Sequence, residues 1–263
     1  MASSNEQRRR QLAREKYERQ AARRAEAHKR SKQRRAIIGA ALAVVVVAAG
    51  GAWAGGVFDS DGKAKTPQAA PTAPVTQVKG CNPPAAGQPN GKQWKTEPAM
   101  TLDAKAAYTA TLTTSCGPVT VSLDAAKAPH TVNSFAFLAG EQYFDHVKCH
   151  RLTTEGIYVL QCGDPTGTGS GGPGYQFPDE NLTGATYPAG TLAMANAGPG
   201  TNGSQFFLVY KDTQLPPNYT PFGKITGGLE VLQNIAAGGV QGGGGDGAPV
   251  ADVVLDKVAV AKG

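Results

Sequence analysis

The sequence predicts a mainly β fold, a closed antiparallel barrel of eight strands capped by two helices. The first observation is that short segments between residues 108 and 261 alternate apolar and polar side chains, the spacing of half-buried strands. The second is that only two segments in this region carry the apolar spacing of a helix. Many short strands with few helices are typical of barrels, because a closed sheet buries one face without a second layer.

The elements follow one another in a regular order. Residues 108–114 and 119–123 alternate around the turn Ser115-Cys-Gly-Pro118, which predicts a hairpin. A helix is predicted over 128–141, because Pro129 suits a first helical turn and an apolar stripe follows it. The remaining predicted elements are strands at 149–153, 157–162, 191–196, 204–210 and 221–225, a helix at 229–237 and a last strand at 251–261.

Two glycine-rich segments, 167–174 and 238–247, are predicted to be loops. Glycine-rich loops bind phosphates when they end in Gly-Lys-Ser/Thr or open a helix after a strand. The segment at 167–174 has neither feature. We therefore expect no nucleotide site in this loop.

The chain before residue 99 has a different composition. Residues 1–35 hold 13 Lys/Arg and 4 Asp/Glu, whereas the rest of the chain holds 13 and 16. The overall positive charge therefore belongs to this tail, and the body shows no basic nucleic-acid footprint. The tail is rich in helix formers without a heptad seam, which favours a solvated or lipid-surface helix.

Residues 36–58 contain no charged side chain in 23 positions. A helix of this length crosses about 30 Å of hydrocarbon. Because Lys and Arg crowd its N-terminal side, we expect a single-pass cell-membrane protein with a cytoplasmic N-terminus and an extracytoplasmic C-terminal domain. The alternative is a cleaved signal peptide, since Ala52-Trp-Ala54 resembles a cleavage site, but the charged segment before it is unusually long.

Residues 59–98 contain seven prolines among small and polar residues, which predicts a semi-extended linker. Cys81 lies within it, so its last part has a means of docking on the body. All four cysteines follow the apolar segment, which suits an oxidising compartment and at least one disulfide. Four reduced thiols are the alternative, and the sequence leaves three complete pairings open. No Cys-x-x-Cys pair occurs, so we expect no bound metal.

Four motifs resemble those of one enzyme family. They are Cys149-His-Arg151, Gln161-Cys-Gly-Asp164, the run MANAGPGTNGSQFF over 194–207, and Pro221-Phe-Gly-Lys224. In this order they resemble the signature stretches of cyclophilins, the peptidyl-prolyl cis–trans isomerases, over residues 99–263. The resemblance implies the helix-capped barrel, no cofactor, and X–Pro isomerisation in proline-containing polypeptides. With the membrane topology expected above, we expect these to be exported polypeptides.

The resemblance also implies roles for individual residues. Arg151 matches the catalytic arginine, Gln161 the glutamine that orients it, and Asn196 the residue whose backbone anchors the peptide. Substrate-binding positions are implied for Tyr158, Val159, Ala195, Gln205, Phe207, Leu215 and Tyr219. This chemistry needs a donor aimed at the proline nitrogen, because a twisted amide loses its resonance and leaves a lone pair there.

The chain departs from the family pattern in three places. The segment between Arg151 and Gln161 is two residues longer than usual, so Tyr158 and Val159 are assigned by counting back from Gln161. Gln214 stands where many members have Trp, and Cys149 and Cys162 replace Phe and Gly. If Arg151 and Gln161 share a face, strand alternation places these two cysteines on opposite faces unless a bulge intervenes.

Two other functions remain open from the sequence. One is a proline-peptide binding or chaperone module with little turnover. The other is a membrane-tethered scaffold whose basic tail is the functional part.

Overall fold

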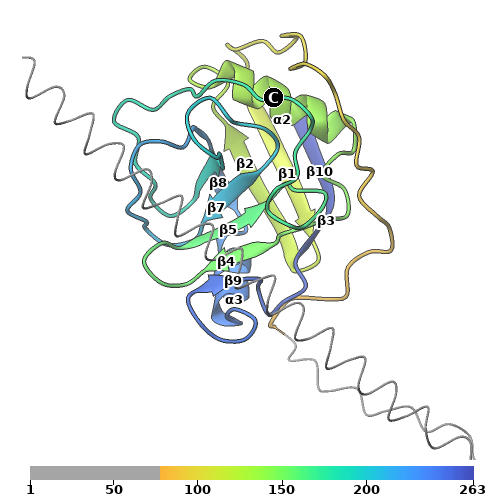
Figure 1. The fold of residues 1–263 in the computed structure, drawn as a ribbon, viewed down its shortest axis with the longest axis vertical. Coiled ribbons are helices and arrows are strands. Elements are labelled where there is room, and N and C mark those ends of the chain that lie inside the picture. The colour runs from red at the N-terminus through yellow and green to blue at the C-terminus, as the bar shows by residue number, and fades with distance from the viewer. Residues whose placement is uncertain (1–77) are drawn as a thin grey trace, which may run out of the picture. The chain divides into compact units, whose positions relative to one another are not determined.

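The computed structural model of the chain describes residues 78–263, which form a ten-stranded antiparallel sheet and two helices (Figure 1). The elements are β1 (Tyr108–Thr114), β2 (Gly117–Leu123), α2 (Pro129–Gly140), β3 (Val147–Lys148), β4 (Arg151–Thr153), β5 (Val159–Cys162), β6 (Thr191–Met194), β7 (Phe206–Val209), β8 (Pro221–Gly227), α3 (Leu229–Ala237), β9 (Asp246–Gly247) and β10 (Val254–Lys262).

The prediction of a closed eight-stranded barrel is wrong in two respects. The sheet has ten strands in the order β3-β10-β1-β2-β8-β6-β7-β5-β4-β9, and its two end strands do not pair with each other. It is therefore a half-barrel. The strand predicted at 149–153 is interrupted, because Cys149 and His150 separate β3, which pairs with β10, from β4, which pairs with β5.

The predicted hairpin and both helices are confirmed. In β1 every second side chain is buried, and its partner β2 runs back in register from Tyr108↔Leu123 to Thr114↔Gly117. Figure 1 shows α2 and α3 at opposite ends of the sheet. A cluster of aromatic rings fills the core between α2 and the sheet, with ring centroids 5.0–5.6 Å apart among Phe135, Phe144, Phe206 and Phe222.

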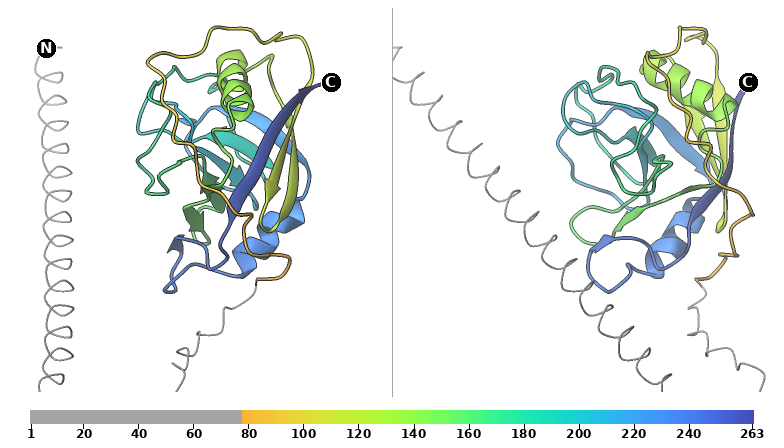
Figure 2. Two further views of the ribbon diagram at one scale, coloured as in Figure 1. Left: turned by 90° about the vertical axis from the view of Figure 1, so that its right-hand side faces the viewer. Right: turned by 45° about the vertical axis from the view of Figure 1, so that its right-hand side comes forward.

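The end of the predicted linker packs on the body. We call residues 78–98 the strap; it runs along the outside of the sheet from the α3 end to the α2 end (Figures 1 and 2). Trp94 packs against Phe137 and Tyr143, with ring centroids 5.2 and 5.8 Å apart. Asn90 donates to the carbonyls of Glu141 and Gln142 just after α2. Of the linker predicted over residues 59–98, only the part before residue 78 stays a prediction.

Two disulfides join all four cysteines. Cys81–Cys116 ties the strap to the turn between β1 and β2, and Cys149–Cys162 ties the start of β4 to the end of β5. The expectation of at least one disulfide is confirmed. Alternation did not predict the second pair, because Cys149 lies in the break between β3 and β4, where its N–H donates to the Val253 carbonyl and its side chain is buried.

The predicted basic tail at 1–35 and the predicted membrane helix at 36–58 lie outside the described residues. Among residues 78–263, no helix has the length and apolar character needed to cross a membrane.

Candidate functional site

Strand register brings the central site residues together. β4, β5, β7 and β6 lie side by side, and their facing residues form two rows across the sheet. One row is buried in the core and consists of Leu152, Leu160, Leu208 and Leu192. The neighbouring row, on the opposite face, consists of Arg151, Gln161, Phe207 and Ala193. Alternation therefore places the predicted arginine, glutamine and phenylalanine on one surface.

Arg151 is held by two neighbours. Its Nε and Nη2 donate to the two carboxylate oxygens of Asp246 at 2.8 and 2.7 Å, and its Nη1 donates to Gln161 Oε1 at 3.3 Å. The bond with Asp246 raises the pKa of Arg151 and lowers the pKa of the Asp246 carboxyl. Both side chains remain more than a third exposed, so the guanidinium is clamped in place yet accessible.

Gln161 continues this contact into the glycine-rich loop. Its Nε2 donates to Gln205 Oε1 at 2.9 Å, and Gln205 Nε2 donates to the carbonyl of Gly171 at 2.9 Å. A chain of side-chain hydrogen bonds thus runs from Asp246 through Arg151, Gln161 and Gln205. Its two ends lie in the two glycine-rich segments of the sequence.

The loop at 167–174 is organised by a buried carboxylate. Asp164 is fully buried and accepts hydrogen bonds from the backbone N–H groups of Thr166, Thr168, Gly169 and Gly171. Burial alone would raise the pKa of Asp164, but these bonds and that of the Thr166 hydroxyl outweigh it and lower the pKa. The N–H groups that could have cradled a phosphate already bind a carboxylate from the chain itself.

An apolar cluster surrounds Phe207, and it is separate from the main core. Its buried members are Val159, Tyr187, Ala193, Phe207 and Val209, and its partly buried rim is formed by Ile157, Ala185, Ala195, Leu215 and Tyr219. Tyr219 stands edge-on to Phe207, with ring centroids 5.6 Å apart. Five of the predicted binding residues therefore meet here: Val159, Ala195, Phe207, Leu215 and Tyr219.

The structure does not bring Tyr158 into this cluster. Its ring packs against Tyr210 at 6.0 Å on the side of the main core, and the ammonium of Lys211 lies 4.2 Å from the ring centroid. Alternation accounts for this, because residues 157, 159 and 161 share one face and residue 158 takes the other. Ile157 occupies the place at the cluster that counting back from Gln161 gave to Tyr158.

Asn196 lies beside the cluster with its backbone free. Its side chain is fixed, because Nδ2 donates to the Asn218 carbonyl at 2.8 Å and Oδ1 accepts from the N–H of Gly198. Among residues 78–263, no hydrogen bond reaches the backbone N–H or carbonyl of Asn196. Both groups are therefore available to an extended peptide.

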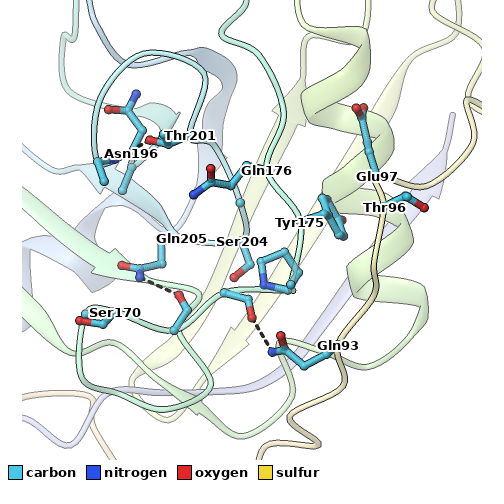
Figure 3. Close-up of a pocket in the computed structure, with 18 of the residues that line it drawn as sticks. Gln93, Thr96, Glu97, Ser170, Tyr175, Gln176, Asn196, Thr201, Ser204 and Gln205 are labelled. Atoms are coloured by element: carbon cyan, nitrogen blue, oxygen red, sulfur yellow. Dashed lines mark hydrogen bonds between the residues drawn. The ribbon is translucent and has the colours of Figure 1, made fainter.

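A pocket of about 1070 Å³ adjoins these residues (Figure 3). Gln161, Ala195, Asn196 and Gln205 line one side of it. The strap lines the other side with Gln93, Lys95, Thr96 and Glu97, and the loop from Gly169 to Gln176 lies between the two. The pocket thus joins residues implied by the resemblance to a segment that was predicted to be a spacer.

Sequence reasoning missed two side chains of the site. Asp246 is the only acidic residue of the loop predicted at 238–247, a signal that could have marked it. Tyr187 is a buried member of the cluster, and its hydroxyl donates to the Tyr219 carbonyl and accepts from the Tyr219 N–H. No local pattern in the sequence distinguishes Tyr187 from a core tyrosine.

Comparison with known proteins gives the family of the chain. Residues 109–260 match the family described as "Cyclophilin type peptidyl-prolyl cis-trans isomerase/CLD". A probable peptidyl-prolyl cis-trans isomerase B from Mycobacterium leprae is 50% identical over 167 residues, covering 58% of this chain and 57% of that protein. The protein of the same name from Mycobacterium tuberculosis is 50% identical over 161 residues, covering 56% of this chain and 52% of that protein.

The chain thus spans about half the length of the curated relatives it matches. A solved structure of a cyclophilin-type isomerase from Cryptosporidium parvum, obtained in the presence of the dipeptide Ala-Pro, covers 59% of this chain and 99% of its own. It has a TM-score of 0.53 and 30% identity. Because the family match extends over more than half of the chain and includes Arg151, Gln161 and Phe207, the chain belongs to the cyclophilin-type peptidyl-prolyl cis–trans isomerase family.

Proposed function

We propose that this protein accelerates cis–trans rotation of X–Pro bonds in exported polypeptides, with Arg151 as the catalytic residue. The observation that carries the proposal is the position of the Arg151 guanidinium. It is exposed, clamped by Asp246 and Gln161, and lies in the same cross-strand row as Phe207 of the apolar cluster. A charged donor therefore stands beside an apolar surface suited to a proline ring.

The reaction breaks no covalent bond in the substrate polypeptide. Rotation about the amide faces a barrier of about 18–20 kcal/mol, because the planar form is stabilised by resonance. In the twisted form the proline nitrogen is pyramidal and carries a lone pair, which the planar form lacks. A donor that bonds to this nitrogen acts only on the twisted form, and such an interaction lowers the barrier.

Arg151 has donors left for this step. A guanidinium carries five N–H groups in a rigid fork. Asp246 and Gln161 occupy three of them, one on each nitrogen. One N–H on Nη1 and one on Nη2 remain for the substrate. Asp246 and Gln161 are thus positioning residues, which hold the fork so that these two groups point in fixed directions.

The rest of the peptide is held by groups that act in both states. The free backbone of Asn196 anchors the chain, Gln205 and Ala195 border it, and Phe207 with Leu215 and Tyr219 receives the ring. These contacts are the same in the planar and twisted amide. They set affinity more than turnover.

Exchange NMR on a peptide with a single X–Pro bond tests the proposal, because it measures rotation and affinity in the same sample. Arg151→Ala should lower turnover by about 10²–10³-fold with little change in affinity. Arg151→Lys should also fail, because an ammonium lacks the planar fork. Phe207→Ala should weaken both quantities together. If Arg151→Ala rotates the peptide at the unmodified rate, the protein is a proline-peptide binding module and the arginine mechanism is wrong.

We further propose that residues 36–58 anchor the protein in the cell membrane, with the tail of 1–35 in the cytoplasm and the isomerase domain outside. The support is the basic segment before an uncharged span and the presence of two disulfides after it. Protease added to intact cells should remove the domain and leave a small protected N-terminal fragment. A protected domain, or a mature chain that begins near residue 55, would contradict the anchor.

A further inference from the structure

The pocket beside Gln161 has a wall that the family match does not include. The match covers residues 109–260, whereas Gln93, Lys95, Thr96 and Glu97 belong to the strap. Figure 3 shows Gln93, Thr96 and Glu97 on the side of the pocket opposite Asn196 and Gln205. The strap therefore adds a surface to the groove that lies outside the isomerase domain common to the family.

The wall is fixed to the body along its length. Gln93 Nε2 donates to the Gly172 carbonyl at 2.7 Å, and the N–H of Trp94 donates to the Pro173 carbonyl at 2.8 Å. Glu97 Oε1 lies 2.8 Å from His130 Nδ1, at the start of α2. These contacts hold Lys95 and Thr96 between two attached points. A fixed wall costs a bound peptide less ordering entropy than a free segment would.

Several polar groups of the pocket are engaged within the protein. Gln93 and Gln205 bond to the carbonyls of Gly172 and Gly171, and the backbone N–H groups of Gly169 and Gly171 bond to Asp164. Glu97 is engaged by His130, and this bond raises the pKa of His130.

Lys95 differs from Glu97 in having no such charged partner among residues 78–263. Lys95 and Glu97 are the only charged side chains that line the pocket. Within the part of the chain that the structure describes, none of the ion pairs involves Lys95, and its side chain is exposed. The pocket therefore presents, at its rim, one positive charge without an ion-pair partner among the described residues.

From this arrangement we propose that the strap is part of the substrate groove and that Lys95 selects polypeptides with an acidic residue near the proline. The inference rests on the proposed function, since it assigns a preference to the same groove. A volume of about 1070 Å³ is enough for several residues of an extended peptide, because it is as large as pockets that enclose whole small ligands. An Asp or Glu side chain on such a segment meets Lys95 across the pocket from Asn196.

The test uses the full-length protein and peptides with one proline in a neutral background. A single Glu is moved through the positions before and after the proline, and each peptide is paired with one that has Gln there. We expect one position, or two adjacent ones, at which Glu raises kcat/KM by about two- to fivefold over Gln, the range of an exposed ion pair. The advantage should fade at high salt.

Variants assign the effect to Lys95. Lys95→Gln should remove the advantage of Glu, and Lys95→Glu should transfer it to Lys-bearing peptides. Each variant is judged by its ratio of kcat/KM for the Glu peptide to that for the paired Gln peptide, so that a change in overall turnover does not enter. Lys105→Gln is the matched control, because it removes an equally exposed positive charge that does not line the pocket and should change nothing.

Affinity measured by NMR titration with the same peptides separates the two proposals. A protein that binds without turning over still shows the Lys95-dependent preference, so loss of turnover alone contradicts only the proposed function. No positional preference for Glu, or a preference that persists in Lys95→Gln, would overturn the role of Lys95.

Discussion

At the scale of single residues, the site depends on where one guanidinium points. Asp246 binds it through both carboxylate oxygens, and Gln161 binds a third N–H. Bidentate pairs of this kind fix orientation as well as distance. An arginine without this clamp would have the same charge and rotate freely, which is why we assign Asp246 a positioning role.

Asp246 should make turnover depend on acid pH. Arg151 lowers the folded pKa of the Asp246 carboxyl from its ordinary value, so the carboxylate is ionised and the clamp intact at neutral and weakly acid pH. As the pH falls through this lowered pKa, the clamp is lost and kcat should drop. Asp246→Asn should have a kcat reduced roughly two- to fivefold at pH 7, without the acid drop, because an exposed ion pair contributes modestly.

The measurement is kcat and KM from exchange NMR between pH 3 and 8, with circular dichroism at each pH to confirm folding. Asp252→Asn is the control, since Asp252 forms an exposed pair with Lys148 away from the site. Asp246→Glu should restore part of the loss. An acid drop that persists in Asp246→Asn would show that another group causes it.

At the scale of elements, residue types and spacing predicted the hairpin and both helices. The site residues Arg151 and Gln161 were implied by the family resemblance and not by spacing. The inward side chain of Cys149 and the contact between Asp246 and Arg151 could not be predicted, because both depend on breaks in the strand pattern. The ladder stops at Cys149, so that side chain turns inward, and Asp246 reaches Arg151 only because β9 pairs with β4. Cross-strand contacts between segments distant in sequence are absent from any local pattern.

The Cys149–Cys162 disulfide lies under the two strands that carry the catalytic pair, so its loss should affect turnover. It closes 13 residues, whereas Cys81–Cys116 closes 35. Loop entropy then predicts losses of unfolding free energy of up to about 3 and 4 kcal/mol for the two Ser/Ser double variants. We expect the opposite order for kcat on a neutral peptide, with the larger loss in Cys149→Ser/Cys162→Ser, because only this pair adjoins Arg151 and Gln161.

Urea unfolding and exchange NMR on both double variants check this contrast. Each serves as the control for the other. Equal effects on kcat, or effects that follow the loss of stability, would show that the disulfide under β4 and β5 has no part in positioning.

At the scale of the whole molecule, the strap makes the folded unit larger than the family match. Composition suggested a spacer up to residue 98, because seven prolines among small and polar residues rarely form a core. The strap needs no core of its own. It packs one tryptophan and one disulfide against a body that is already folded.

A truncation series should locate the true boundary. A chain that begins at residue 78 should unfold in urea like the full-length protein, because it keeps the strap. A chain that begins at residue 99 loses the Cys81–Cys116 link, exposes Phe137 and Tyr143, and leaves the Glu141 and Gln142 carbonyls without Asn90. Its free energy of unfolding should fall on the order of 5 kcal/mol, combining the cross-link with a partly buried tryptophan.

Trp94→Ala in the full-length protein separates these contributions. It keeps the disulfide and removes the ring, so it should cost about 2 kcal/mol, less than a fully buried Trp because Trp94 is partly exposed. Trp94→Phe should recover much of this loss by keeping an aromatic ring against Phe137. If the chain beginning at residue 99 is as stable as the one beginning at residue 78, the strap only lies on the body and the domain starts where the composition placed it.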